Sequence, residues 1–305
     1  MSGLELSVVV CTHNPCSDYL ERVMGALRGQ SLGPDRWELL VIDNASDQPL
    51  GARLDLAWQA NARIVREETL GLTPARLRGI EEAAGELLVF VDDDNVLAPD
   101  YLEVALQVAA DKPFLGAWSG QCVPEFDAVP PPWLRRYWGN LALRQVERDI
   151  WSNLPREPET APCGAGLCIR RDAAQEYLAL NRGGQRRFQL DRAGKSLLSG
   201  GDQDLAACAC DIGYGVGVIA ALRLTHLIPA GRLTLDYQAR LAEGIQFSSV
   251  ILDFLRGGEV GRHRVKWSHV VRAWLTPGAP HRRIQLACLT GRRRALAYVA
   301  EMERA

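Results

Sequence analysis

The stretch Glu86-Leu-Leu-Val-Phe-Val-Asp-Asp-Asp-Asn95 joins an apolar run directly to three carboxylates. The apolar run has the length and the residue types of a buried strand. Three adjacent carboxylates repel one another and resist removal from water, so this position requires compensation by a cation, by solvent or by hydrogen-bond donors. A divalent metal is the simplest compensation, because hard oxygen ligands suit Mg²⁺ or Mn²⁺. A solvated acidic turn is the alternative.

The sequence before this stretch alternates between two periodicities. Apolar runs of strand length occupy residues 6–11, 38–42 and 62–66, and patterns with helical spacing occupy residues 19–29 and 73–84. Pro74 fits the first turn of the second helix, where its missing N–H breaks no hydrogen bond. Apolar strands separated by helices indicate an α/β fold whose mostly parallel sheet is covered by helices on both faces.

Polar residues stand where these strands end. Thr12 and Asn14 follow the first strand, Asp43 follows the second, and the three aspartates follow the fourth. Ligands of such sheets bind outside the carboxyl ends of the strands. We therefore expect these side chains to gather along one edge of the sheet. A turn or a helix cap is the alternative explanation for Thr, Asn and Asp at such places.

Charge is distributed unevenly along the 305 residues, whose net charge is −2. Residues 256–305 hold 11 Lys or Arg against 3 Asp or Glu, together with Trp267 and Trp274. Such a segment could contact an anionic membrane, and a solvated basic face is the alternative. No apolar run approaches the ~20 residues that cross a bilayer. We expect a cytoplasmic protein, at most peripheral at the inner face of the membrane, with no nucleic-acid partner.

Four motifs follow one another in the first hundred residues. They are Ser7-Val-Val-Val-Cys-Thr-His-Asn14, Val41-Ile-Asp-Asn-Ala-Ser-Asp47, Gly71-Leu-Thr-Pro-Ala-Arg-Leu-Arg-Gly79 and Val91-Asp-Asp-Asp-Asn95. In this order they resemble the motifs of the family 2 glycosyltransferases, which have the GT-A fold. The resemblance spans roughly residues 6–245, and its specificity lies in the order, because a lone D-x-D pattern is common by chance. One departure is Leu77, which stands where the family commonly has Asn.

The resemblance implies a nucleoside-diphosphate sugar as donor and assigns the polar residues around its base. Asp43 would accept a hydrogen bond from the base, which suits the imide N–H of uracil or thymine and hence a UDP- or dTDP-sugar. Thr12 and Asn14 would line the same pocket, and Arg76 would lie close to the nucleotide.

The resemblance also divides the aspartate cluster into separate tasks. Asp92 would contact the ribose, and Asp94 would bind Mn²⁺ or Mg²⁺ together with the diphosphate. Asp93 would belong to the nucleotide-sugar site without an assigned contact. His226, in Thr225-His-Leu-Ile-Pro229, resembles a histidine that assists the metal or pyrophosphate, and imidazole is a ligand for Mn²⁺. A structural histidine is the alternative.

A second acidic site occurs in Leu198-Ser-Gly-Gly-Asp-Gln-Asp-Leu205, ahead of an Ala-rich helical stretch. It resembles the family's Glu-Asp motif, with Gly201 in place of Glu. Asp202 is our candidate base, which would deprotonate an acceptor hydroxyl and invert the configuration of the transferred sugar. Asp204 is the competing candidate, and a helix N-cap is the alternative for either residue.

Further along, the chain has features suited to recognising a saccharide. The glycines of Gly164-Ala-Gly166 would let a sugar approach the backbone, although a tight turn explains them equally well. Trp118, Trp133 and Trp138 are candidates for stacking on sugar faces, although a structural role is commoner for Trp. From about residue 234 the pattern is largely helical.

Together these expectations describe an inverting glycosyltransferase with three segments. Residues 1–115 would bind the nucleotide sugar, residues 116–245 would bind the acceptor and complete catalysis, and residues 246–305 would form a helical, basic extension. The acceptor would be a hydroxyl of a growing glycan or of a lipid-linked saccharide.

Other classes fit the sequence less well. No glycine-rich turn follows the first strand, which argues against a Rossmann dehydrogenase, and a nucleotidyltransferase usually needs a basic triphosphate loop there that is absent. A sugar-nucleotide-binding protein without turnover is permitted by Gly201 and Leu77. The presence of both Asp94 and Asp202 argues against it.

Overall fold

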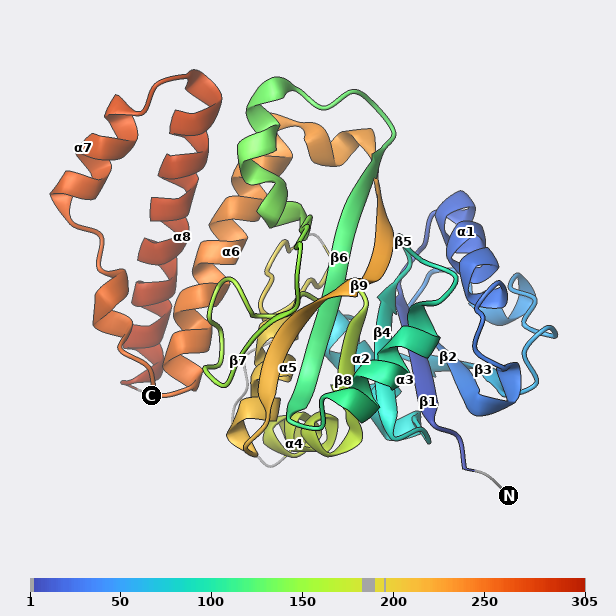
Figure 1. Cartoon of the computed structure of the whole chain (residues 1–305). Helices are drawn as coiled ribbons and strands as arrows, with labels where there is room; N and C mark the ends of the chain where they lie inside the picture. The colour runs from blue at the N-terminus through green and yellow to red at the C-terminus, as the bar shows by residue number, and fades with distance from the viewer. Residues whose placement is uncertain (1–2, 183–189, 195, 305) are drawn as a thin grey trace. The chain divides into compact units, whose positions relative to one another are not determined.

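The structure is a computed structural model that describes residues 3–182, 190–194 and 196–304 (Figure 1). The chain divides into two compact units. The first contains Met1–Glu125, Ala142–Arg186 and Asp202–Leu227, and the second contains Phe126–Leu141, Arg187–Gly201 and Ile228–Ala305. The functional division predicted at residues 115 and 245 stays a prediction, because compactness does not test which segment binds which substrate.

The strands form one sheet in the order β3-β2-β1-β4-β8-β6-β9-β5, and β7 also pairs with β9. Strands β1, β2, β3 and β4 are parallel, whereas β8 runs antiparallel to β4 and β6, and β5 and β7 run antiparallel to β9. The strands are β1 Leu6–Thr12, β2 Trp37–Asn44, β3 Ala62–Glu67, β4 Leu87–Asp92, β5 Asn95–Leu97, β6 Leu115–Phe126, β7 Ile150–Ser152, β8 Leu167–Arg170 and β9 Gly215–Ile228.

Helices cover the parallel part of this sheet, as the sequence predicts. Every residue of β1 and β2 is buried, which explains their nearly continuous apolar sequences. Helix α2 lies close to β1, since a Cβ added at Gly79 would stand 2.3 Å from Val9 Cγ1. The helices of the first unit are α1 Ser17–Arg28, α2 Leu72–Glu82, α3 Tyr101–Asp111, α4 Arg171–Arg182 and α5 Gly201–Asp211, whose first residue belongs to the second unit.

The four predicted strands and two predicted helices of the first hundred residues are all present, with ends that differ by at most three residues. The predicted face of α1 is also correct, because Leu20, Val23, Met24 and Leu27 are its buried residues. Short 3-10 helices occupy Pro34–Arg36, Leu50–Ala52, Pro132–Leu141, Ala230–Leu233 and Val260–His263.

The second unit is built mainly from α6 Leu235–Leu255, α7 Trp267–Leu275 and α8 Ala279–Met302. Helix α8 packs against both α6 and α7 (Figure 1). The approach to α6 is close at Gly291, where an added Cβ would stand 2.2 Å from the Glu243 carbonyl oxygen. The predicted helical C-terminal extension is confirmed. No helix among the described residues is both long and apolar enough to cross a membrane.

Candidate active site

The register of the parallel strands brings the predicted polar residues to one edge of the sheet. Thr12 at the end of β1 is the register partner of Asp43 on β2, and Cys11 is the partner of Asp92 on β4. The polar ends of three strands that are far apart in sequence therefore lie side by side. This juxtaposition follows from the alternation of strands and helices alone, and the structure contains it.

Asp43 is buried and holds the loop that follows β2. Its side chain accepts hydrogen bonds from the Ser46 N–H at 3.3 Å, from the Leu50 N–H at 3.1 Å and from Arg66 Nη1 at 3.0 Å. Burial alone would raise the pKa of this carboxyl, but the bonds from Ser46 and Leu50 and the Arg66 guanidinium outweigh it and lower the pKa. Arg66 is a partner that sequence analysis missed, although Asp43 and Arg66 are register partners.

We expect Asp43→Asn to lower the free energy of unfolding by about 1–3 kcal/mol near neutral pH, because a buried carboxylate loses its charge-assisted bonds. The folded-state pKa lies below the ordinary value of 3.8, so the stabilisation is complete above that value and is lost as the pH falls through the lower folded-state pKa. Urea denaturation at several pH values measures the difference.

The matched control is Glu125→Gln, which removes an ion pair with Arg22 whose two side chains are about half exposed. We expect a change of about 0.5 kcal/mol or less, because solvent screens such pairs. Equal losses of unfolding free energy for the two variants near neutral pH would contradict the stabilising role that we assign to the Asp43 carboxylate.

The loop after β1 is tied to the loop after β2 and to the aspartate cluster. Thr12 Oγ1 donates a hydrogen bond to Asp93 Oδ2. The Asn14 backbone N–H donates to Ser46 Oγ at 3.0 Å, and the Asn14 side chain exchanges two hydrogen bonds with Asp47. Asn14 has a φ of 49°, a conformation that Asn tolerates better than most residues. Hydrogen bonds therefore connect the loops that carry Thr12, Asn14 and Asp43, and their contact with a nucleobase stays a prediction.

Asp94 and His226 meet at the start of the short strand β5. Asn95 on β5 is the register partner of His226 on β9, and His226 Nε2 lies 3.4 Å from Asp94 Oδ2. Both side chains are buried, and the Asp94 carbonyl accepts a hydrogen bond from the Leu227 N–H at 2.8 Å. The two residues that the sequence assigned to a metal are thus neighbours in space.

Asn95 is a member of this cluster that sequence analysis did not assign. It is fully buried, and its Nδ2 donates to Asp94 Oδ1 at 2.9 Å. Its Oδ1 is also buried and accepts no hydrogen bond from the described residues. A buried amide oxygen without a donor is costly, so this atom is suited to a ligand at the site. The only sequence signal is that Asn95 directly follows the three aspartates.

The residues present fit a divalent metal that protein and substrate share. The described residues contain no group of three or more His, Cys, Asp or Glu side chains arranged to hold an ion alone. Asp94 offers oxygen, His226 offers nitrogen, and the Asn95 oxygen lies beside them. Mg²⁺ and Mn²⁺ are commonly held by one or two side chains and complete their coordination with water and substrate phosphates. These three side chains therefore offer a partial set of metal ligands, which a substrate diphosphate would complete.

Arg76, Gly164 and Asp202 form a second cluster within the first unit. The Gly164 N–H donates to Asp202 Oδ2 at 2.8 Å. A Cβ added at Gly164 would stand 2.7 Å from Arg76 Nη2 and 3.4 Å from Asp202 Oδ2, so both side chains reach the same glycine. Asp202 is only partly buried, whereas the competing Asp204 is 2% exposed. An acceptor hydroxyl can reach Asp202 more readily.

Two expectations about sugar contacts change. Trp118 is fully buried on β6, so the proposed stacking of this side chain on a sugar is wrong. Gly166 has a φ of +67°, and an added Cβ would stand 2.3 Å from Tyr101 Oη, so backbone conformation and packing explain this glycine. Trp133 and Trp138 are partly buried, and their contact with sugars stays a prediction.

The sequence of the chain is similar to that of known glycosyltransferases. The family model described as "Glycosyl transferase family 2" matches residues 7–178, which is more than half of the chain. A glucosyl-dolichyl phosphate glucuronosyltransferase of Haloferax volcanii is 25% identical over 141 residues, covering 44% of each chain. Glycosyltransferase AglE of the same organism is 26% identical over 101 residues, covering 32% of this chain and 33% of AglE. The first of the curated relatives are covered over less than half of their own length.

Solved structures share the fold over almost the whole chain. TarS 1-349 of S. aureus in complex with UDP-GlcNAc has a TM-score of 0.54 at 14% identity, covering 98% of this chain and 92% of that chain. The mannosyltransferase PcManGT from Pyrobaculum calidifontis, in complex with GDP-Man and Mn²⁺, has a TM-score of 0.53 at 20% identity, covering 97% and 75%. At this identity the likeness shows the fold, which is the predicted GT-A fold.

Proposed function

The chain belongs to glycosyl transferase family 2, and we propose that it transfers a sugar from a nucleoside-diphosphate sugar to a hydroxyl of a saccharide or lipid-linked saccharide with inversion. The observation that carries this proposal is the meeting of Asp94 and His226, with 3.4 Å between Oδ2 and Nε2, at the sheet edge where β1, β2 and β4 end. Such an edge is where α/β sheets bind nucleotides.

Donor binding in this proposal is divided among three groups of residues. Asp43, Thr12 and Asn14 bind the base, Asp92 binds the ribose, and Asp93 belongs to the same site without an assigned contact. Structural neighbours are complexes with UDP-GlcNAc and with GDP-Man, which supports a nucleoside-diphosphate sugar as the class of donor. We favour a uracil or thymine base, because the carboxylate of Asp43 accepts hydrogen bonds and both bases carry an imide N–H.

Asp94 and His226 would hold Mn²⁺ or Mg²⁺, with the Asn95 oxygen as a further acceptor beside it. When bound, the metal supplies Lewis-acid stabilisation of the departing diphosphate. A neighbour in complex with GDP-Man and Mn²⁺ supports a divalent ion in this fold. Arg76, whose guanidinium lies beside Gly164, would add positive charge near the nucleotide.

Asp202 would act as the base. The acceptor oxygen forms a bond to the anomeric carbon while the bond from that carbon to the diphosphate oxygen breaks, and the hydroxyl proton moves to the Asp202 carboxylate. The nucleoside diphosphate leaves with the electron pair. Because attack and departure occur on opposite faces, the configuration inverts. The Gly164 N–H bond to Oδ2 orients the carboxylate and leaves part of it open to solvent.

Calorimetric titration with UDP-, dTDP- and GDP-sugars tests donor binding. We expect at least one uridine or thymidine donor to bind in Mn²⁺ and to bind at least about tenfold more weakly in excess chelator, since the metal and the diphosphate complete each other's coordination. Binding of no sugar nucleotide in either condition would reject the proposed donor class. Equal binding in both conditions would reject the metal's part in it.

A further inference from the structure

Helix α7 exposes an unusually apolar face. Trp267, Val271, Trp274 and Leu275 are spaced by four, three and one residues, which places them on one side of a helix. Their exposed fractions are 78%, 38%, 59% and 74%. Four large apolar side chains on one nine-residue helix form a patch rather than scattered surface residues.

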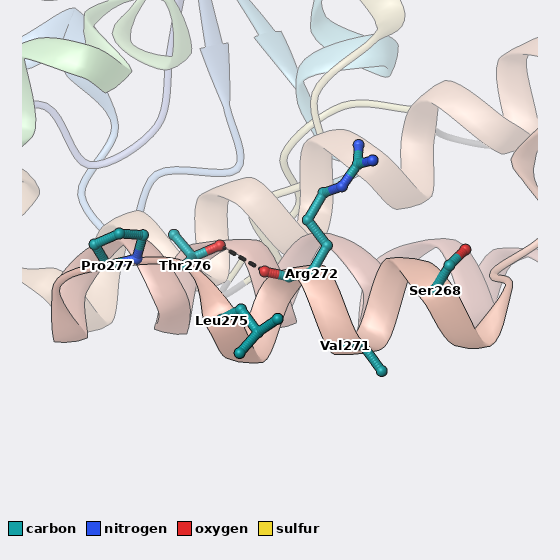
Figure 2. A pocket seen from close by; sticks show the side chains of 6 residues that line it. All are labelled: Ser268, Val271, Arg272, Leu275, Thr276 and Pro277. Carbon is teal, nitrogen blue, oxygen red and sulfur yellow. Dashed lines mark hydrogen bonds between the residues drawn. The ribbon is translucent and has the colours of Figure 1, made fainter.

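The opposite side of α7 packs against the rest of the second unit. Ala273 is buried, and α7 packs against α8. Figure 2 shows Val271 and Leu275 directed away from the helices behind them, whereas the Arg272 side chain extends to the other side. A hollow of about 500 Å³ along this helix is lined by Ser268, Val271, Arg272, Leu275, Thr276 and Pro277. The apolar face of α7 therefore points away from α8, the helix against which α7 packs.

The surroundings of this face carry positive charge without acidic neighbours in the sequence. Between Glu259 and Glu301 the chain has no Asp or Glu. Arg264, Lys266 and Arg272 are exposed, and the structure pairs none of them with an acidic side chain among the described residues. By contrast, Arg262, Arg283 and Arg294 are paired with Asp253, Asp236 and Glu243.

We propose that α7 docks in the headgroup region of an anionic phospholipid bilayer. Trp267, Trp274 and Leu275 enter the boundary between headgroups and acyl chains, and the cations at Arg264 and Lys266, which immediately precede the helix, bind lipid phosphates. Exposed tryptophans beside Lys and Arg on an amphipathic helix are typical of interfacial binding, because indole has an apolar body and an N–H that prefers the wet boundary. This inference goes beyond the transfer reaction and does not depend on it.

Charge and size favour a bilayer over a second copy of the chain. Two copies joined at this face would bring their unpaired cations together, which is unfavourable. A nine-residue helix is only about 14 Å long, which is short for the roughly 800 Å² that each partner buries in a stable interface. An anionic bilayer would both bury the apolar side chains and neutralise the cations.

Sedimentation of the full chain with vesicles tests the proposal. We expect binding to vesicles of phosphatidylcholine with phosphatidylglycerol, and at least tenfold weaker binding to phosphatidylcholine alone. The variant W267A/W274A should lower affinity for the anionic vesicles by tenfold or more. The matched control is Trp151→Ala, which removes a tryptophan that is 55% exposed on β7 of the first unit, and it should change affinity less than twofold. Circular dichroism should show all variants folded, since these side chains are exposed.

Two further measurements separate the contribution of the cations from that of the tryptophans. Arg264→Glu with Lys266→Glu should weaken binding tenfold or more, and brominated lipid should quench the fluorescence of the parent chain but not of W267A/W274A. Absence of parent binding to anionic vesicles at low salt, or equal losses for W267A/W274A and W151A, would overturn the proposal. So would light scattering that shows a lipid-free dimer abolished by W267A/W274A, because that result assigns the face to a second copy.

Discussion

Asp202→Asn is expected to lower kcat for sugar transfer by about 10²- to 10⁴-fold, the usual contribution of a general base. The amide cannot take the proton of the acceptor hydroxyl, yet it keeps the shape of the carboxylate and can still accept the Gly164 N–H bond through its oxygen. Donor affinity in Mn²⁺ should therefore change little. Steady-state kinetics with a soluble acceptor and calorimetry with the donor measure the two quantities separately.

The competing base provides the control for this result. Asp204 is buried within the first unit, so Asp204→Asn should lower thermal stability and change kcat much less than Asp202→Asn does. Full transfer by Asp202→Asn would remove the role of base from this residue. A loss of kcat in the folded Asp204→Asn variant as large as that expected for Asp202→Asn would move the role to Asp204.

Asp94→Ala should weaken Mn²⁺ binding by roughly 100-fold or more, and sugar transfer should fall with it. The carboxylate is the one anionic ligand that the protein contributes in our proposal, and its loss leaves His226 and the Asn95 amide. Titration of Mn²⁺ followed by electron paramagnetic resonance measures metal affinity without any need for turnover. His226→Ala should have a smaller effect, because it removes a neutral ligand.

Asp111→Ala serves as the matched control, because Asp111 is an exposed carboxylate at the end of α3. It should leave Mn²⁺ affinity unchanged. Metal affinity in Asp94→Ala equal to that of the parent would refute the assignment of the metal to Asp94, whatever happens to transfer.

The sequence predicted the parallel half of the sheet well because its signals are local. An apolar run such as residues 6–11 is buried on both faces, and the helix that follows shows its buried face through spacing alone. The meeting of Thr12, Asp43 and Asp92 then follows from a topological rule and not from any knowledge of pairing distances.

Contacts between distant segments could not be predicted in this way. The antiparallel pairing of β5 with β9, which brings Asn95 opposite His226, depends on which strands find each other across the sheet. The resemblance to a family predicted that His226 assists a metal or pyrophosphate, and the structure adds Asn95, whose buried Oδ1 accepts no hydrogen bond from the described residues. The burial of Trp118 was missed for the same reason, because β6 lies between β8 and β9 in the sheet.

The exposed face of α7 is a second kind of feature that the sequence alone did not predict. Composition identified a basic, Trp-containing C-terminal segment, but composition does not say which side of a helix faces its neighbours. Only the packing of α7 on α8 shows that Trp267, Trp274 and Leu275 are the residues left outside.

The most direct test of the central claim is release of nucleoside diphosphate from UDP-, dTDP- and GDP-sugars by the parent chain in the presence of soluble saccharide acceptors, measured by chromatography with Mn²⁺ and again with excess chelator. We predict release from at least one uridine or thymidine donor in Mn²⁺, loss of that release in chelator, and none from Asp94→Ala. Release that continues undiminished in chelator would contradict a metal held by Asp94 and His226, and no release from any donor in either condition would contradict glycosyl transfer by this site.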